Sequence, residues 1–408
     1  MDYVAGNLSE TGENSVFRTK LCEASLLEYM FATDNDGTGM LRQASAYMKR
    51  HLPEDVAKKM YQQYQDGKKA EADGKTEYSV EDADQAIINA KKEKEQADQN
   101  DKEGAPQEEA GEKNIQDNEN NHAQDAEDSK KESPIQIVLQ LKQNALLGMT
   151  VSDMSSLSAK AVEAKDMVSN RQCETGRYDM KKAEKMNVSD RVMVLEYIGK
   201  HFSDYTEPGK GDLTYEMEYI LCGKDTDKKN LESSIERLMR MREAANVAHI
   251  IADREKLNQT LMIATSLAGF SGNPAVVKIV QIGVVAAWAY VESILDLRTL
   301  LSGGKISLIK SAAEWTTDLK KLGEIVTGEG EARECKNGLS YQAYIKQLLF
   351  AMKEKKMAYR MMDIMELAMQ KEQNGKNARM DHMIDNMICE LRFEAKPLFA
   401  KRSLYGDM

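Results

Sequence analysis

Residues 213–250 read LTYEMEYILCGKDTDKKNLESSIERLMRMREAANVAHI, and this stretch decides how the rest of the chain is interpreted. Its first nine residues alternate strictly, because every odd position is apolar or aromatic and Thr214, Glu216 and Glu218 lie between them. A period of two with aromatic enrichment predicts a half-buried β-strand. The pattern of residues 228–251 predicts a long helix. We therefore expect a strand, a corner and a helix.

The corner, CGKDTDKKN, is the most site-like segment of the chain. It has one glycine and one following lysine, whereas a phosphate-binding P-loop needs GxxxxGK[ST]. Lys229 and Asn230 break the pattern of a calcium loop that Asp225 and Asp227 could begin. A structural interpretation accounts for each residue, since Gly223 would end the strand and Asp225, Thr226 or Asp227 would cap the helix.

Apolar spacing predicts helices along most of the chain. A second alternating segment near the C-terminus, RMDHMIDNMICELRFEAKPLF, predicts another strand. Because a lone strand is not stable, we pair the two strands (near 213–221 and 380–396) in a small antiparallel sheet. The predicted fold class is α+β, mostly α, with a helical body and one sheet. The other predicted helices cover residues 14–65, 134–149, 187–202, 254–270, 275–301 and 340–370.

The helix at 274–301 is apolar on all sides around Trp288, which predicts the central buried helix of the fold. Its uncharged apolar run, residues 279–291, is shorter than a membrane span requires, so we favour a core helix over a transmembrane one. Lys278 and Glu292, at the two ends of this run, are expected to reach water. A cluster of methionines at 357–369 is likewise predicted to be core, with an adaptable binding groove as the alternative.

The acidic charge of the chain is concentrated in one segment. Of the net charge of −11, residues 91–133 carry −7, from 14 acidic residues and 7 lysines, and Ile115 is their only large apolar residue. Such a segment is expected to be disordered, as a tolerated insertion or as an acidic interaction tail or spacer. We divide the chain into an N-terminal helical segment (1–90), this insert (91–133) and a main α+β domain (134–408).

Composition excludes several classes of site. No block of Lys and Arg predicts nucleic-acid binding. The five cysteines form no CxxC pair, and the five histidines form no HxxxH or HExxH motif. We therefore predict no metal site, no cofactor and no disulfide framework. The N-terminus lacks the pattern of a signal peptide, so the chain as written is predicted to be soluble.

Two residue pairs could support catalysis. Ser302 and Lys305 match S-x-x-K, but they follow a long helix where paired glycines are typical of a C-cap. Glu292 and Asp296 lie four residues apart on one helix face and could act as acid and base, or could bind arginines such as Arg242 on another helix. We favour the C-cap and the ion pairs, and we assign no catalytic residue.

From about residue 190 onward the chain resembles a family of unknown function in Gram-positive anaerobes. The resemblance is carried by DRVMVLEYIGKHFSDYT, by YEMEYILCGKDTDKKNLESSIERLMRMREAAN, by AWAYVESILDLRTLLSGGKISLIK, by Trp315 and by RMDHMI. Members are often encoded near tad-type pilus genes. They usually begin with a TadE-like or pilin-like membrane helix, and this sequence starts downstream of such a segment. The resemblance implies an extracytoplasmic, membrane-anchored parent protein.

We therefore expect a non-enzymatic cell-surface or pilus-associated structural or assembly protein. Its expected partners are pilus components or further copies of itself, with membrane contact through an N-terminal anchor absent from this sequence. The alternatives are a cytoplasmic helical scaffold that binds a partner, and a hydrolase built on one of the two pairs above.

Overall fold

The structure, a computed structural model, describes residues 21–52, 167–177, 186–268, 273–319, 332–335, 337–372, 375–393 and 396–404, and positions 58, 61, 62 and 65. The strands are β1 (Leu21–Phe31), β2 (Ile384–Phe393) and β3 (Lys396–Leu404). The helices are η1 (Asp34–Gly37), α2 (Thr38–His51), α6 (Val188–His201), α7 (Glu216–Cys222), α8 (Asp227–Ala252), α9 (Arg254–Ala268), α10 (Pro274–Leu301), α12 (Tyr341–Phe350), α13 (Glu354–Lys371) and η5 (Met380–His382). The predicted insert at 91–133 and the predicted helix at 134–149 lie outside the described residues.

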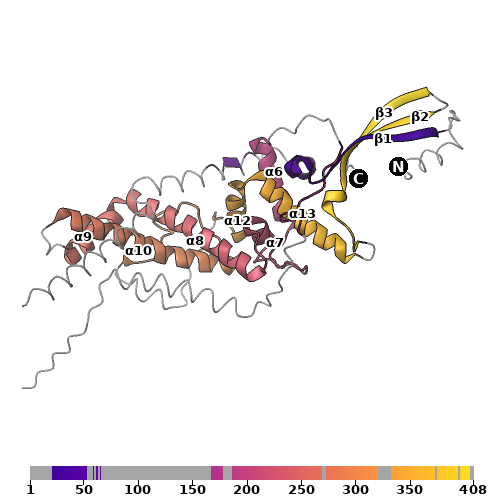
Figure 1. The fold of residues 1–408 in the computed structure, drawn as a ribbon. Coiled ribbons are helices and arrows are strands. Elements are labelled where there is room, and N and C mark those ends of the chain that lie inside the picture. The colour runs from indigo at the N-terminus through magenta and orange to yellow at the C-terminus, as the bar shows by residue number, and fades with distance from the viewer. Residues whose placement is uncertain are drawn as a thin grey trace, which may run out of the picture.

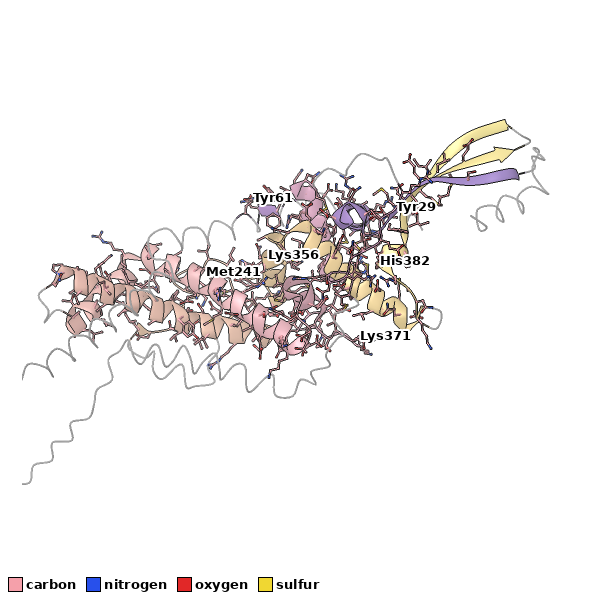
Figure 2. The ribbon with its side chains drawn as sticks, viewed as in Figure 1. Tyr29, Tyr61, Met241, Lys356, Lys371 and His382 are labelled. Atoms are coloured by element: carbon pink, nitrogen blue, oxygen red, sulfur yellow. The ribbon has the colours of Figure 1, made fainter. Side chains whose placement is uncertain are left out.

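The molecule is elongated, with a helical body between two dissimilar ends (Figure 1). The sheet projects from one end, and α9 lies at the other. Most described elements are helices, so the α+β, mostly α fold class is confirmed. Figure 2 places Tyr29 and His382 at the base of the sheet, where Tyr29 donates its backbone N–H to the carbonyl of Arg177 (2.8 Å).

The sheet has three antiparallel strands in the order β1-β2-β3. The strand predicted near 380–396 is confirmed as β2, but its partners differ from the prediction. Leu26 pairs with Cys389 on one side of it, and Lys401 pairs with Cys389 on the other. β1 lies in a region predicted to be helical, because the local spacing of its apolar residues fits a helix. The strand conformation comes from pairing with residues more than 350 positions away, which local spacing does not reveal.

The strand predicted at 213–221 is wrong, because residues 216–222 form the short helix α7. The alternation is misleading since α7 is enclosed by protein on nearly every side. Glu218 is fully buried and accepts the backbone N–H of Tyr205 (3.0 Å). Glu216 accepts the N–H of Ser203 (2.9 Å). The acidic residues that the pattern assigns to water therefore hold the preceding loop.

The helix predicted at 340–370 is two helices, α12 and α13. Between them Arg191 donates to the carbonyl of Met352, so a side chain from α6 binds the backbone where α12 ends. The prediction that the methionines of α13 belong to the core is confirmed. Met357, Met361 and Met362 are fully buried in the main hydrophobic core, and Met365 and Met369 pack against it.

Helix α10 packs along both α8 and α9. It begins where sequence predicts, since Asn273 accepts the N–H of Ala275 (2.9 Å) and Pro274 occupies the first turn. From Val285 to Leu300 it is almost entirely buried, as the core-helix prediction expects. Its first two turns are largely exposed, and Ile279 is 38% exposed. Only the second part of α10 is therefore a central buried helix.

Candidate functional site

The charged residues that the sequence singled out meet inside the body. Asp296 on α10 faces Arg242 on α8, and both side chains are fully buried. Arg242 donates from Nε (3.0 Å) and Nη2 (2.8 Å) to Oδ2 of Asp296. Asn246, one turn after Arg242, donates to the same oxygen (3.0 Å) and to Ser293 (2.9 Å). The predicted ion pair between the two helices is therefore present.

Arg242 also fixes the segment that follows α10. Its Nη1 donates to the carbonyls of Ser307 (3.0 Å) and Leu308 (2.9 Å) and to the hydroxyl of Tyr344 (2.9 Å). The guanidinium carbon lies 5.6 Å from the centre of the Tyr344 ring. One side chain thus ties α8, α10, α12 and the 306–310 segment together.

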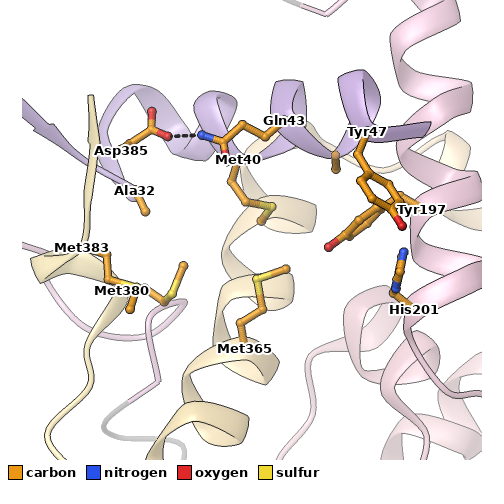
Figure 3. A pocket seen from close by; sticks show the side chains of 11 residues that line it. Ala32, Met40, Gln43, Tyr47, Tyr197, His201, Met365, Met380, Met383 and Asp385 are labelled. Carbon is orange, nitrogen blue, oxygen red and sulfur yellow. Dashed lines mark hydrogen bonds between the residues drawn. The ribbon is translucent and has the colours of Figure 1, made fainter. Parts of the chain in front are cut away.

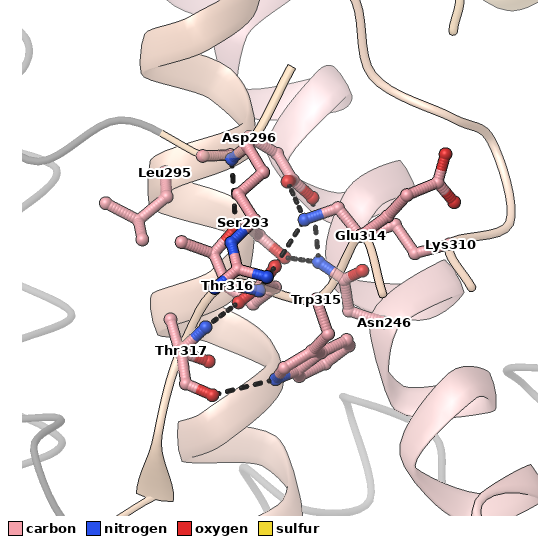
Figure 4. Close-up of polar contacts among 12 residues, drawn as sticks. Asn246, Ser293, Leu295, Asp296, Lys310, Glu314, Trp315, Thr316 and Thr317 are labelled. Atoms are coloured by element: carbon pink, nitrogen blue, oxygen red, sulfur yellow. Dashed lines mark hydrogen bonds and ion pairs between the residues drawn. The ribbon is translucent and has the colours of Figure 1, made fainter. Parts of the chain in front are cut away.

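Lys310 is the fourth charge of this cluster, and sequence reasoning missed it. Its ammonium, fully buried, binds Glu292 and lies 2.5 Å from Oδ1 of Asp296. Glu292 is also fully buried, and its two oxygens accept the N–H groups of Thr316 (3.0 Å) and Thr317 (2.9 Å) (Figure 4). The expectation that Glu292 reaches water is wrong, because the chain after α10 folds back over it. No local signal marks Lys310. The chain has many other lysines, and the apolar residues around this one show no helical or strand periodicity.

The four charges of the cluster (Arg242, Glu292, Asp296 and Lys310) sum to zero. Burial opposes ionisation of Asp296, but the charges of Arg242 and Lys310 outweigh it and hold the pKa of Asp296 below its ordinary value. Both carboxylates are thus occupied by cations and amides. An acid–base pair needs an oxygen that substrate can reach, and these side chains have no exposed surface.

Aromatic rings cover the other side of the cluster. Trp288 is 2% exposed and donates to Thr317 (2.7 Å), and its ring meets Trp315 edge to face, with centroids 5.6 Å apart. His249 stacks on Trp315 at 4.7 Å, and burial lowers the pKa of His249. His249 is therefore a packed side chain of the body.

The corner that opens the sequence discussion is a junction of two helices. Gly223 ends α7, not a strand, with φ of 63°, and an added Cβ would come within 2.3 Å of Arg360. Thr226 is the N-cap of α8 and accepts the N–H of Lys229 (3.3 Å). Asp227 accepts the N–H of Thr214 (2.9 Å) and so pins the loop before α7. Asp225 lies at the surface and pairs with Lys229.

The S-x-x-K match is a helix end. Ser302 is the C-cap of α10 and donates its hydroxyl to the carbonyl of Thr299 (3.0 Å). Gly303 follows with φ of 90°, a conformation that glycine tolerates best. The predicted C-cap therefore accounts for Ser302, and nothing in its hydrogen bonding activates it as a nucleophile.

Glu218 is a buried carboxyl of a different kind. Burial raises its pKa to about 7, although Tyr341 (2.7 Å) and the amide of Tyr205 donate to its Oε1. Its Oε2 atom has no hydrogen-bond partner. Asp204, also buried, adds a like charge that favours the neutral form. A carboxyl with this pKa could exchange protons near neutral pH, but it lies inside the main core, away from any described cavity.

A cavity of about 320 Å³ lies between α2, α6, α13 and the base of the sheet (Figure 3). Met40, Met365, Met380 and Met383 form much of its lining, and Asp385 accepts a hydrogen bond from Gln43 (2.6 Å). The lining carries no cation paired with a nucleophile. Among the described residues, no three His, Cys, Asp or Glu side chains gather as metal ligands would.

By length and composition alone, α10 could cross a membrane, and it is the one helix of the described part of the chain that could. Half of its most apolar window is buried within the protein, and core helices of soluble proteins pass the same test of length and composition. The transmembrane alternative therefore gains little from this helix.

Comparison with known proteins places most of the helical body in one family. The model of a family of unknown function, DUF5702, matches residues 124–395, which is more than half of the chain. The matched range begins well before residue 190, where the resemblance seen in the sequence starts. No curated protein and no solved structure matches. The chain, with its ion cluster and its α7–α8 corner inside the matched range, belongs to the DUF5702 family of unknown function.

Proposed function

We propose that this chain is a non-enzymatic structural or assembly protein of the cell surface, associated with pili of the tad type. Its role is to hold contacts between surface components rather than to transform a substrate. The localisation and the pilus association come from the sequence resemblance described above. The structural role is supported by the way the body uses its charged residues.

The buried ion cluster is the observation that carries the proposal. Glu292 and Asp296 were candidates for acid–base chemistry. These two carboxylates and the cations Arg242 and Lys310 instead bind one another and backbone groups. They join α8 and α10, which have 26 and 28 residues and so extend about 40 Å each. A long helix pair whose relative position is fixed by a buried network of ion pairs and hydrogen bonds is better suited to a rigid spacer than to an active site.

Several described residues favour this proposal over the versions of the alternatives that depend on them. A scaffold that binds through the methionines of α13 would need those side chains at the surface, yet Met357, Met361 and Met362 are fully buried. A hydrolase built on Ser302 would need an activated hydroxyl, whereas this hydroxyl donates to a helix carbonyl. A hydrolase built on Glu292 and Asp296 would need an opening to solvent.

The proposal is tested in the native organism. An antibody against the protein should detect it on intact cells, and brief protease treatment of those cells should remove the signal while leaving a cytoplasmic marker intact. Pili sheared from the cells should carry the protein with them, and a strain lacking the pilin should release less of it. A protein found only in the cytoplasm, protected from the protease, would contradict the proposal.

A further inference from the structure

The end of the helical body opposite the sheet, where α9 lies (Figure 1), has almost no charged residues. Between residues 257 and 291 the sequence has one charged residue, Lys278, although 30% of the whole chain is charged and about ten would be expected in a stretch of this length. This stretch covers most of α9 and the first two-thirds of α10. Burial explains the second part of it, because α10 is enclosed from Val285 onward. Burial does not explain the first part.

The uncharged end is also where apolar side chains face outward. On α9, Leu261 is 43% exposed and Met262 is 73% exposed. On α10, Val276 and Ile279 are 37% and 38% exposed. These two helices are held side by side by buried contacts, among them Gln281 of α10 donating to Thr260 of α9 (3.3 Å). We call the outer part of this pair, residues 261–268 and 274–280, the apolar tip.

We propose that the apolar tip inserts into the surface of a lipid bilayer. Its two exposed segments rise about 10–12 Å, which matches the depth at which interfacial helices lie and falls far short of the ~30 Å needed to span. Charged residues begin again at Asp253, Arg254, Glu255 and Lys256, on the side toward the body. The apolar tip therefore inserts into one leaflet, while these four charged residues stay in water.

Lipid fits the composition of the tip better than a protein partner does. Protein interfaces accept charges at their rim, whereas the acyl region excludes them. The charge that is present, Lys278, is exposed and has a long apolar stem that lets its ammonium reach the headgroups. Because the chain as a whole carries −11, attraction to anionic lipid does not drive the contact. Burial of apolar side chains is thus expected to drive insertion. Binding should therefore be insensitive to salt and no stronger on anionic vesicles than on neutral ones.

The test uses the full chain and phosphatidylcholine vesicles in a flotation assay, with and without 0.5 M salt. The protein should float with the vesicles at both salt concentrations. Leu261→Asp and Ile279→Asp should each lower the partition coefficient at least about tenfold, since each replaces inserted apolar surface by a charge. Val188→Asp is the matched control, because Val188 is 44% exposed but lies on α6, away from the tip. It should float like the unmodified protein.

A second measurement places the tip within the bilayer. Met262→Trp introduces an exposed indole, while Trp288 and Trp315 of the chain are buried. Vesicles with brominated acyl chains should quench the new fluorophore and leave that of Val188→Trp unchanged. Failure to float, flotation that survives both Asp substitutions, or absence of quenching would each overturn the proposal.

A dimer that forms without vesicles and is lost in Leu261→Asp would overturn it in favour of contact with a second copy. Because the vesicle assay uses purified protein, its outcome is independent of the pilus association proposed above.

Discussion

Loss of the proton from buried Glu218 should make stability fall as pH rises toward neutrality. The carboxyl has a pKa near 4.5 when unfolded and about 7 in the folded protein, because it is buried with one oxygen unpartnered. Between these values the folded state binds more protons than the unfolded state, so the free energy of unfolding decreases with pH. At about 1.4 kcal/mol per unit of pKa, this stabilisation is largest below pH 4.5, shrinks by about 3 kcal/mol by pH 7 and levels off only above pH 7.

Glu218→Gln removes this dependence, since the amide keeps an oxygen to accept from Tyr341 and Tyr205 but does not ionise. The measurement is urea unfolding at pH 4.5, 5.5, 6.5 and 7.5. Other carboxyls contribute to the absolute profile, so the useful quantity is the stability of the unmodified protein minus that of the variant. This difference should fall by about 3 kcal/mol across the range. Glu207→Gln, at an exposed carboxylate of the same loop, is the control. A difference constant to within about 0.5 kcal/mol would refute the reasoning.

Further substitutions test the helix cap, the ion cluster and the core. Thr226→Ala should lower stability by about 0.5–2 kcal/mol through loss of the α8 cap, while Asp225→Ala at the surface should change it by less than about 0.5 kcal/mol. Urea unfolding should rank the two variants in this order with and without calcium. A calcium-dependent gain in stability that is lost in Asp225→Ala would contradict the prediction. Arg242→Met leaves buried acceptors unpaired and should cost about 3–5 kcal/mol, a prediction that an undisturbed melting curve would reject. Met361→Ala opens a cavity in the core and should cost about 2–5 kcal/mol by the same unfolding assay, whereas a cost near zero would mean that the side chain is not core. Trp288 should resist acrylamide quenching in the folded protein, and ready quenching would place it at a surface.

Local sequence was sufficient wherever neighbouring residues decide the conformation. The starts of α8 and α10 follow from short polar caps and from a proline in the first turn, which act within three or four residues. The burial of Trp288 and of the α13 methionines follows from helical spacing, because a helix face that is apolar must be covered. The pairing of Asp296 with Arg242 was one of two alternatives that the sequence allowed.

Local sequence failed where a distant segment supplies the partner. Alternation at 213–221 indicated a strand, but Glu216 and Glu218 are held by loop amides and a tyrosine that only the folded chain brings near. Residues 21–31 have helical spacing and become β1 because β2, more than 350 residues later, completes their backbone hydrogen bonds.

The sequence by itself thus determined most of the long helices, the N-caps of α8 and α10, the apolar face of α10 and the mostly helical class, because each depends on contacts within a few residues. The tertiary structure alone decided the partners of the sheet and the burial of Glu292 beneath Lys310. It also decided which part of α10 is enclosed and which part stays exposed at the apolar tip. These features depend on where the chain returns in space, and periodicity carries no information about that return.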